Sequence, residues 1–321
     1  MSPSLALVAG ASRGLGLLIA RQLGRRGLTV VICSRDESEL DAAARLLRED
    51  GATVHPLVCD VDDAEAVRSM VTRVENELGP IDVAIHVAGI IQVQPLESAT
   101  LQDFEDSTRT MLMGPVHLAL AVLPMMRERR RGRIGTVASI GGAVSVPHLL
   151  PYSTAKFGAV GFARGLSAEL DGTGVTSTAI LPGLMRTGSH LNAQFGGDAA
   201  AEHAWFAPGA SLPLVSMDAE RAAERIVSGV IAGRNQVVLT PLAQIGMRVA
   251  GLAPSLTTSV MKRVARALPG AADPSAPLVD GHTARRRLDS PTVERLTTLG
   301  TRAAKRLNQF HEKSAQGKVA S

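Results

Sequence analysis

Near its N-terminus the chain reads Leu5-Ala6-Leu7-Val8-Ala9-Gly10-Ala11-Ser12-Arg13-Gly14-Leu15-Gly16, and this stretch decides the fold. The apolar run Leu5–Ala9 predicts a buried strand, and the glycines behind it lead into an apolar helical segment. Glycines allow a tight turn, and they let backbone N–H groups approach a pyrophosphate at the helix N-terminus. Such a turn alone is a weak signal, but its place between the first strand and a helix strengthens it; the alternative is an ordinary strand–helix turn. The residues predicted to bind the cofactor here are Gly10, Ser12, Arg13, Gly14, Leu15 and Gly16.

Strand-like runs and amphipathic stretches alternate as far as residue 240. Residues 67–78 and 222–230 carry apolar side chains at helical spacing. This alternation indicates an α/β domain over residues 1–240, with a parallel sheet covered by helices on both faces. The expected strands are Leu5–Ala9, Thr29–Cys33, Val54–Cys59, Ile81–Val87, Arg133–Ala138, Val175–Leu181 and Gln236–Leu239.

The composition is globular: 45 % of the 321 residues are hydrophobic and 20 % are charged, which excludes a disordered or fibrous chain. Cys33 and Cys59 are too few for a disulfide-stapled secreted scaffold, so we expect a reducing, cytoplasmic location. Residues 1–10 lack the basic start of a signal peptide. The apolar run Thr110–Met126 contains two prolines and is short for a membrane span, so we expect a buried helix. No cysteine–histidine cluster has metal-ligand spacing, so no metal is expected.

The end of the second strand predicts which nicotinamide cofactor binds. An Asp or Glu there would accept a hydrogen bond from the 2′-hydroxyl of NAD and repel a 2′-phosphate. The chain instead reads Ser34-Arg35, and Arg13 lies in the glycine turn. Two guanidinium groups at one place suit a phosphate dianion, so NADP(H) is favoured. The alternative is that either arginine is merely solvated.

A tyrosine and a lysine predict the catalytic centre. Tyr152 is the only tyrosine in the chain, Lys156 is the only lysine before residue 262, and the two lie four residues apart on one face of an expected helix. A free phenol has a pKa of ~10 and is a poor acid–base group at neutral pH. A nearby ammonium favours the phenolate and lowers that pKa. Ser139, thirteen residues before the tyrosine, ends a strand and can polarise a substrate carbonyl.

Over about residues 4–240 the chain resembles the short-chain dehydrogenase/reductase family. The motifs that carry the resemblance are Gly10-x-x-x-Gly14-x-Gly16, Asp60-Val61, Ala88-Gly89, Ser139, Tyr152-x-x-x-Lys156 and Pro182-Gly183. They occur in the family's order and spacing, and the combination is highly specific. The resemblance implies a Rossmann-type, doubly wound parallel sheet of seven strands. It also implies hydride transfer between a nicotinamide and a carbonyl or alcohol carbon.

The resemblance implies a role for each site residue. Tyr152 would be the general acid–base, Ser139 would orient the substrate oxygen, and Lys156 would bind the ribose and lower the tyrosine pKa. The remaining cofactor contacts would come from Ser34, Arg35, Asp60, Val61, Ala88, Gly89, Pro182, Gly183, Met185 and Thr187. Among these, Asp60 and Val61 would flank the adenine.

Two positions depart from the family pattern. The family's Asn-Asn-Ala-Gly reads His86-Val87-Ala88-Gly89, a mild change at a structural turn. An asparagine that helps to hold a proton-relay water in the family is replaced by Met111, whose thioether is at best a weak acceptor. Met111 puts turnover in doubt, but not the fold or the cofactor.

The segment Gly188–Ser216 stands where the family places a substrate lid. Trp205 and Phe206 lie in it, and further apolar residues flank the catalytic motifs. Such a lining suits a bulky apolar substrate such as a steroid, polyketide or fatty-acyl compound. The alternative is that the two aromatic residues only pack the lid down. The residues expected to line the substrate site are Leu149, Leu150, Met185, Trp205 and Phe206.

The end of the chain is built differently. Residues 1–240 hold 21 basic and 25 acidic side chains, a balance of −4, whereas residues 241–321 hold 13 and 5, a balance of +8. Residues 241–268 combine an apolar stripe with four basic residues and no acidic one. This helical extension could lie on an anionic membrane, but we favour packing on the core or on a dimer partner. Residues 269–321 read as a polar basic tail, with a linker and a helix over 290–313 that Ser290 caps. No aromatic residues accompany the run of arginines at 285–287, so nucleic-acid binding is not expected.

These patterns predict an NADP(H)-dependent oxidoreductase that acts on the carbonyl or secondary alcohol of a bulky apolar substrate, as a homodimer or homotetramer. The alternative is a nucleotide-binding regulatory or scaffold protein that has lost turnover through Met111. The intact Ser139, Tyr152 and Lys156 argue against that alternative.

Overall fold

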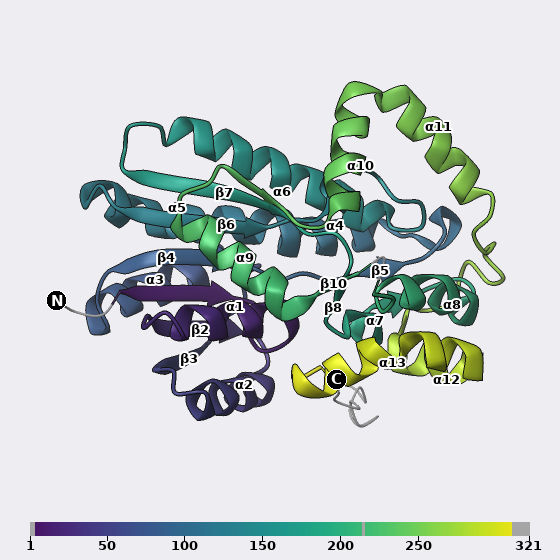
Figure 1. Ribbon diagram of the computed structural model, residues 1–321, viewed down its shortest axis with the longest axis horizontal. Coiled ribbons are helices and arrows are strands. Elements are labelled where there is room, and N and C mark those ends of the chain that lie inside the picture. The colour runs from purple at the N-terminus through teal and green to yellow at the C-terminus, as the bar shows by residue number, and fades with distance from the viewer. Residues whose placement is uncertain (1–3, 214–215, 310–321) are drawn as a thin grey trace.

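A seven-stranded parallel sheet forms the centre of the molecule (Figure 1). The computed structural model describes residues 4–213 and 216–309. The strand order is β11-β7-β6-β4-β1-β2-β3. The strands are β1 (Leu5–Ala9), β2 (Thr29–Ser34), β3 (Val54–Val58), β4 (Ile81–His86), β6 (Gly132–Val137), β7 (Val175–Leu181) and β11 (Gln236–Val238). The expected Rossmann-type, doubly wound fold is confirmed.

The strand order reverses at β1, and this reversal positions the site. β1 pairs with β2 on one side and with β4 on the other, so that Leu7 lies opposite both Val31 and Ala84. The chain builds β1, β2 and β3 outward, and then returns to build β4 and the later strands on the other side. In doubly wound sheets, ligands bind outside the carboxyl ends of the strands at such a switch point.

Helices cover both faces of the sheet, as the amphipathic spacing predicted. One face packs against α1 (Gly14–Gly24), α2 (Glu37–Glu49) and α9 (Ala219–Ile231), and the other against α3 (Ala64–Glu77), α5 (Gly114–Glu128) and α6 (Leu150–Glu169). Asp36 and Asp63 cap α2 and α3, because their carboxylates accept hydrogen bonds from first-turn N–H groups. All five residues of β1 are buried, as a strand covered on both faces requires.

The run Thr110–Met126 lies within one long helical stretch. α4 (Leu101–Thr108), the π-helical turn η2 (Arg109–Met113) and α5 follow one another without a break. In the described part of the chain, only Leu101–Glu128 is long and apolar enough to cross a membrane, and half of its apolar window is buried. Leu118, Ala119 and Val122 pack into the core under the sheet. This burial is what we expected of the run.

Short elements form the lid over the carboxyl edge of the sheet. The lid comprises β8 (Met185–Arg186), α7 (Ser189–Asn192), β9 (Gln194–Phe195), α8 (Ala199–Gly209) and β10 (Met217–Asp218). β10 pairs with β8, and β9 lies between β5 (Gln92–Val93) and β12 (Val279–Asp280). β12 belongs to the C-terminal segment, so that segment is tied to the lid by strand pairing.

The expectation of a polar tail after residue 269 is wrong for the described residues. α12 (Gly281–Leu288) and α13 (Pro291–Arg306) pack along the lid (Figure 1). Gly281 and Gly300 lie against His190, and a Cβ on either glycine would collide with it. Ser290 caps α13 as predicted, but the helix ends at Arg306, and residues 310–313 of the predicted helix lie outside the described residues. The polar composition did not predict this packing, because small residues such as Gly281 and Gly300 supply the contacts.

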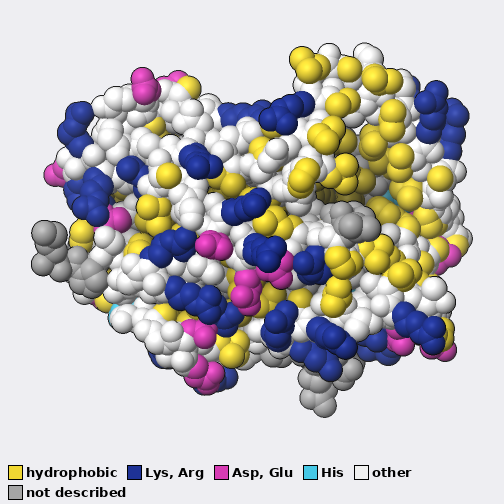
Figure 2. Space-filling view, in the orientation of Figure 1, with side chains coloured by type: hydrophobic (Ala, Val, Ile, Leu, Met, Phe, Trp, Pro, Cys, Tyr) yellow, Lys and Arg dark blue, Asp and Glu magenta, His cyan; other side chains and the backbone are white. Residues whose placement is uncertain are grey.

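The extension 241–268 does not pack on the core along its apolar stripe, and its packing on a dimer partner stays a prediction. It forms α10 (Pro241–Leu252) and α11 (Pro254–Ala265), which stand away from the body (Figures 1 and 2). α11 buries none of its residues, and α10 buries only Ala243. Pro254 separates the two helices, as its position predicted.

Candidate active site

The glycine turn is shaped for close approach of a ligand. Gly10 and Gly14 have φ angles of +84° and +59°, which favour glycine. A Cβ on Gly10 would collide with the backbone of Ala88, and one on Gly16 with the carbonyl of Gly10. The N–H groups of Leu15 and Gly16 point out of the first turn of α1 and have no backbone acceptor within residues 4–213 and 216–309. These donors fit the pyrophosphate of a dinucleotide.

Glu39, which no sequence pattern singled out, pairs with Arg13, one of the two arginines predicted to bind the 2′-phosphate. Its carboxylate is largely buried, accepts from Arg13 Nη1 at 2.8 Å, and accepts from Ser12 Oγ at 3.2 Å. Arg13 is therefore already paired within the protein. The signal that could have revealed Glu39 is its distance from β2. It lies in the first turn of α2, five residues after β2 ends at Ser34.

Arg35 leaves the end of β2 and is exposed, with Nη1 3.9 Å from Asp60 Oδ2. Asp60 and Val61 follow β3 beside Ser34, whose carbonyl accepts from the N–H of Cys59. The structure thus brings the residues predicted for the adenine side, Ser34, Arg35, Asp60 and Val61, to one edge of the sheet. Arg35 keeps most of its surface free for an anion.

The end of α13 and the residues after it contact the glycine turn directly. We call residues 291–309 the C-terminal clasp. The Gly14 N–H donates to the Leu307 carbonyl at 2.9 Å, and Asn308 Nδ2 donates to the carbonyls of Ser12 (2.8 Å) and Glu39 (3.0 Å). Asn192 of the lid donates to the Gln309 carbonyl at 3.0 Å. The clasp therefore joins the cofactor turn to the lid, a link between residues almost 300 positions apart that no local pattern predicted.

The residues predicted to be catalytic meet at the carboxyl end of β6. Ser139 caps the short helix η3 (Ile140–Gly142), and its Oγ accepts from the Gly141 N–H at 3.0 Å. A Cβ on Gly141 would lie 3.0 Å from the Tyr152 ring and 3.4 Å from Ser139 Oγ, so the three residues share one corner. Lys156 Nζ donates to the Val137 carbonyl at 2.8 Å and lies 5.7 Å from the centre of the Tyr152 ring.

Burial dominates the electrostatics of this corner. It raises the pKa of Tyr152, and a hydrogen bond with Ser139 opposes that rise. Burial also lowers the pKa of Lys156 to about 7. Lys156 was expected to lower the tyrosine pKa; in this structure burial raises that pKa, and the group that opposes the rise is Ser139.

Met111, which replaces the asparagine of the family pattern, lies near Lys156. It is buried in the π-helical turn, and its Sδ would lie 3.3 Å from a Cβ on Gly89, while Lys156 Nζ would lie 3.8 Å from the same point. The neighbouring His86 is also buried, and its Nε2 has no hydrogen-bond partner in the described chain. Burial, and then the charges of Lys156 and His117, lower the pKa of His86 to about 3. A neutral imidazole therefore stands against Gly114, the residue that follows the π-helical turn holding Met111.

The loop after β7 carries the residues predicted for the nicotinamide side. The Pro182 carbonyl accepts from the Ile140 N–H at 2.8 Å, which fixes this loop beside Ser139. Gly183 is closely packed against Thr240. Thr187 is buried, and its Oγ1 accepts from the Ser189 N–H at 3.3 Å. Of the predicted set, Met185 packs against the core on the α1 and α9 side and not in the aromatic cluster of the lid.

An apolar cluster adjoins Tyr152. Leu149, Trp205 and Phe206 pack together with it, and their role as substrate lining stays a prediction. Leu150 does not join them; it is exposed and faces a groove beneath α11. Glu202, which the sequence analysis missed, is fully buried and accepts from Trp205 Nε1 at 2.6 Å, and its other oxygen lies 2.7 Å from His148 Nδ1. Glu202 thus fixes the tryptophan of the lid against the loop before Tyr152.

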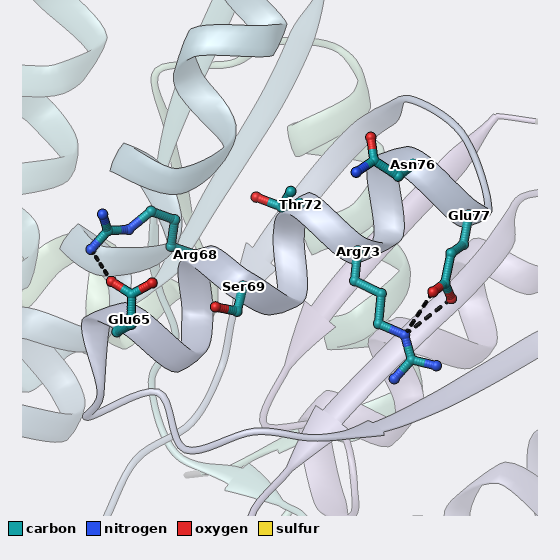
Figure 3. Close-up of a pocket in the computed structure, with 7 residues that line it drawn as sticks. All are labelled: Glu65, Arg68, Ser69, Thr72, Arg73, Asn76 and Glu77. Carbon is teal, nitrogen blue, oxygen red and sulfur yellow. Dashed lines mark hydrogen bonds and ion pairs between the residues drawn. The ribbon is translucent and has the colours of Figure 1, made fainter.

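A second hollow, of about 450 Å³, lies on α3, away from this cluster (Figure 3). All of its lining residues come from that one helix, and the pairs Glu65–Arg68 and Arg73–Glu77 cross it. It contains none of the residues predicted for cofactor or catalysis. Within the described residues, no group of three or more His, Cys, Asp or Glu side chains could hold a metal ion.

Comparisons with known proteins agree with this geometry. The family model described as short chain dehydrogenase matches residues 4–194. A Streptomyces coelicolor protein named as a ketoacyl reductase is 39 % identical over 189 residues, which are 57 % of this chain and 71 % of that protein. Human 17-beta-hydroxysteroid dehydrogenase 13 is 25 % identical over 263 residues, 81 % of this chain and 82 % of that protein. A crystal structure of an actinorhodin polyketide ketoreductase variant with NADPH has a TM-score of 0.67 and 31 % identity, and covers 77 % of this chain and 99 % of its own. The chain belongs to the short-chain dehydrogenase/reductase family.

Proposed function

We propose that the protein is an NADP(H)-dependent oxidoreductase that interconverts a ketone and a secondary alcohol on a bulky apolar substrate in the cytoplasm. The observation that carries the proposal is the meeting of Ser139, Tyr152 and Lys156 at the carboxyl end of the sheet, beside the glycine turn. In a chain with one tyrosine and five lysines, this arrangement is specific.

The side chains supply the proton chemistry of ketone reduction. NADPH, when bound, supplies the hydride that reaches the carbonyl carbon. Tyr152 gives its phenolic proton to the carbonyl oxygen, and Ser139 donates a hydrogen bond that holds that oxygen in place. Lys156, with a pKa of about 7, can carry a proton at neutral pH, and the hydrogen bond with Ser139 favours the phenolate left behind. Alcohol oxidation reverses each transfer.

The preference for NADP(H) rests on charge at the adenine side. The last residue of β2 is Ser34 and not a carboxylate, and the Arg35 that follows it is exposed. Arg13 is paired with Glu39, so a 2′-phosphate would either share Arg13 with that carboxylate or displace the carboxylate. Two neighbouring structures, the actinorhodin ketoreductase variant and a gluconate 5-dehydrogenase, were solved with NADPH and NADP.

The substrate class rests on the cluster of Leu149, Trp205 and Phe206 beside Tyr152. Relatives named for ketoacyl and hydroxysteroid substrates handle carbonyl compounds of this apolar kind. For the assembly we propose a homodimer or homotetramer, since Leu120 on α5 is an exposed apolar residue that a second subunit can cover.

The test is oxidation of NADPH with a panel of apolar ketones, for wild type and Tyr152→Phe. The variant should bind NADPH as wild type does and reduce no ketone, because its ring packs alike but has no proton to give. A variant that reduces an accepted ketone at the wild-type rate refutes the catalytic assignment. If wild type binds NADPH but turns over no substrate, the scaffold alternative that Met111 raises is favoured instead.

A further inference from the structure

The helices α10 and α11 expose an apolar surface on which no other part of the described chain packs. We call residues 241–268 the helical arm. Leu242, Ile245, Val249 and Leu252 repeat at helical spacing along α10, and Leu256, Val260 and Val264 along α11. These side chains are between 38 % and 88 % exposed. Figure 2 shows the apolar side chains gathered over both helices. Exposed apolar patches of this extent mark interaction surfaces.

The arm is anchored by a different face from the one it exposes. Ala243 is buried, and Met247 packs against the core at the β7–α6 side, where its Sδ accepts from Gln236 and Arg164. Helical spacing puts these two residues opposite the stripe on α10. A groove of about 630 Å³, lined by Leu150, Phe157 and Met261 among others, separates α11 from the body. On α10 the stripe therefore points away from the surface that Ala243 and Met247 contact.

The charge of the helical arm indicates which kind of partner covers its apolar stripe. Arg248, Lys262, Arg263 and Arg266 are exposed, and residues 241–268 contain no acidic side chain. An apolar stripe flanked by basic residues is the pattern of helices that lie in the interface of an anionic membrane. Symmetric pairing of two arms in a dimer would bring four cations against four cations, which is unfavourable.

We propose that the helical arm docks the protein on an anionic membrane surface, with the stripes of α10 and α11 in the acyl region and the four basic residues at the lipid headgroups. This proposal does not depend on the proposed catalytic function, because it concerns binding alone. It places the groove beside Leu150, at the start of the helix that carries Tyr152, next to the lipid.

The test is sedimentation of the full-length protein with phosphatidylcholine vesicles, with and without 30 mol % phosphatidylglycerol. Wild type should bind the anionic vesicles, bind the neutral ones far more weakly, and dissociate at high salt. Leu252→Ser combined with Leu256→Ser should weaken binding about tenfold or more. Lys262→Glu combined with Arg266→Glu should weaken it about fivefold for each charge removed.

The matched controls are Leu101→Ser, an exposed leucine on α4, and Arg221→Glu, an exposed arginine on α9; neither should change vesicle binding. All variants should keep their melting temperature and their NADPH binding, since the altered side chains are exposed. Absence of binding to anionic vesicles, or equal losses in arm and control variants, overturns the proposal. So does a change from dimer to monomer in the leucine variants without any vesicle binding, which would make the arm a protein interface.

Discussion

Two buried histidines at the contact between the lid and the C-terminal clasp should make that contact sensitive to acid. His190 on α7 and His203 on α8 are 1 % and 0 % exposed, with ring centres 6.1 Å apart. None of their four ring nitrogens has a hydrogen-bond partner in the described chain. Burial, and then the neighbouring His203, Arg285 and His282, lower the pKa of His190 to about 3. Burial, Arg285 and His282 lower that of His203 to about 4.

The sign of the effect follows from proton uptake. An unfolded histidine has a pKa of about 6.5, so below that pH the unfolded chain binds protons that the folded chain refuses. The two histidines therefore cost no stability above pH 6.5, and the free energy of unfolding decreases as the pH falls toward 4. Each histidine contributes a slope of about 1.4 kcal/mol per pH unit, or about 2 kcal/mol between pH 6.5 and 5. Two of them remove about 4 kcal/mol, a large part of the 5–15 kcal/mol that stabilises a typical domain.

The assay is urea unfolding at pH 7.5 and pH 5.0 for wild type, His203→Phe and Phe206→Leu. His203→Phe replaces the imidazole with a ring that cannot titrate, so this variant should lose about 2 kcal/mol less than wild type on acidification. Phe206→Leu, on the same helix, should be less stable than wild type at both pH values. The free energy that it loses between pH 7.5 and pH 5.0 should equal the wild-type loss. Equal acid losses in wild type and His203→Phe would refute the reasoning, because His203 would then be protonated in the folded state.

Three further predictions concern the cofactor and the proton route. Arg35→Asp should weaken NADPH binding by about ten- to a hundredfold and favour NADH, because it replaces a charge-assisted contact with repulsion; a fluorescence titration with unchanged NADPH affinity would contradict this. Met111→Asn should raise steady-state turnover without changing NADPH affinity; unchanged turnover in stopped-flow and steady-state assays would place the proton route elsewhere. Asn308→Ala removes two hydrogen bonds that hold the Ser12 and Glu39 carbonyls, so NADPH should bind several-fold more weakly by calorimetry; tighter binding would show that the clasp blocks the site.

The sequence by itself determined the sheet and the catalytic corner, because both depend on local pattern. The strands are short apolar runs, most of them rich in Val, Ile or Thr, and the amphipathic flanking helices show their apolar faces as repeats of three or four residues. Tyr152 and Lys156 are four residues apart on one helix, so their proximity follows from helical geometry alone. Ser139 follows β6, and the glycine turn follows β1. Parallel strands bring their carboxyl ends to one edge of a sheet, which joins these residues without further information.

Only the tertiary structure decided what surrounds that corner. The pairing of Arg13 with Glu39 joins residues 26 positions apart, and the bond from Asn308 to Ser12 joins residues 296 positions apart. No period in the sequence records such contacts. The helical arm illustrates the same limit of sequence periodicity. Periodicity reveals that a helix has an apolar face, but the same stripe serves equally for a core, a partner or a membrane. What covers the stripe depends on where the rest of the chain packs, and here α12 and α13 pack on the lid while α10 and α11 leave their stripe exposed.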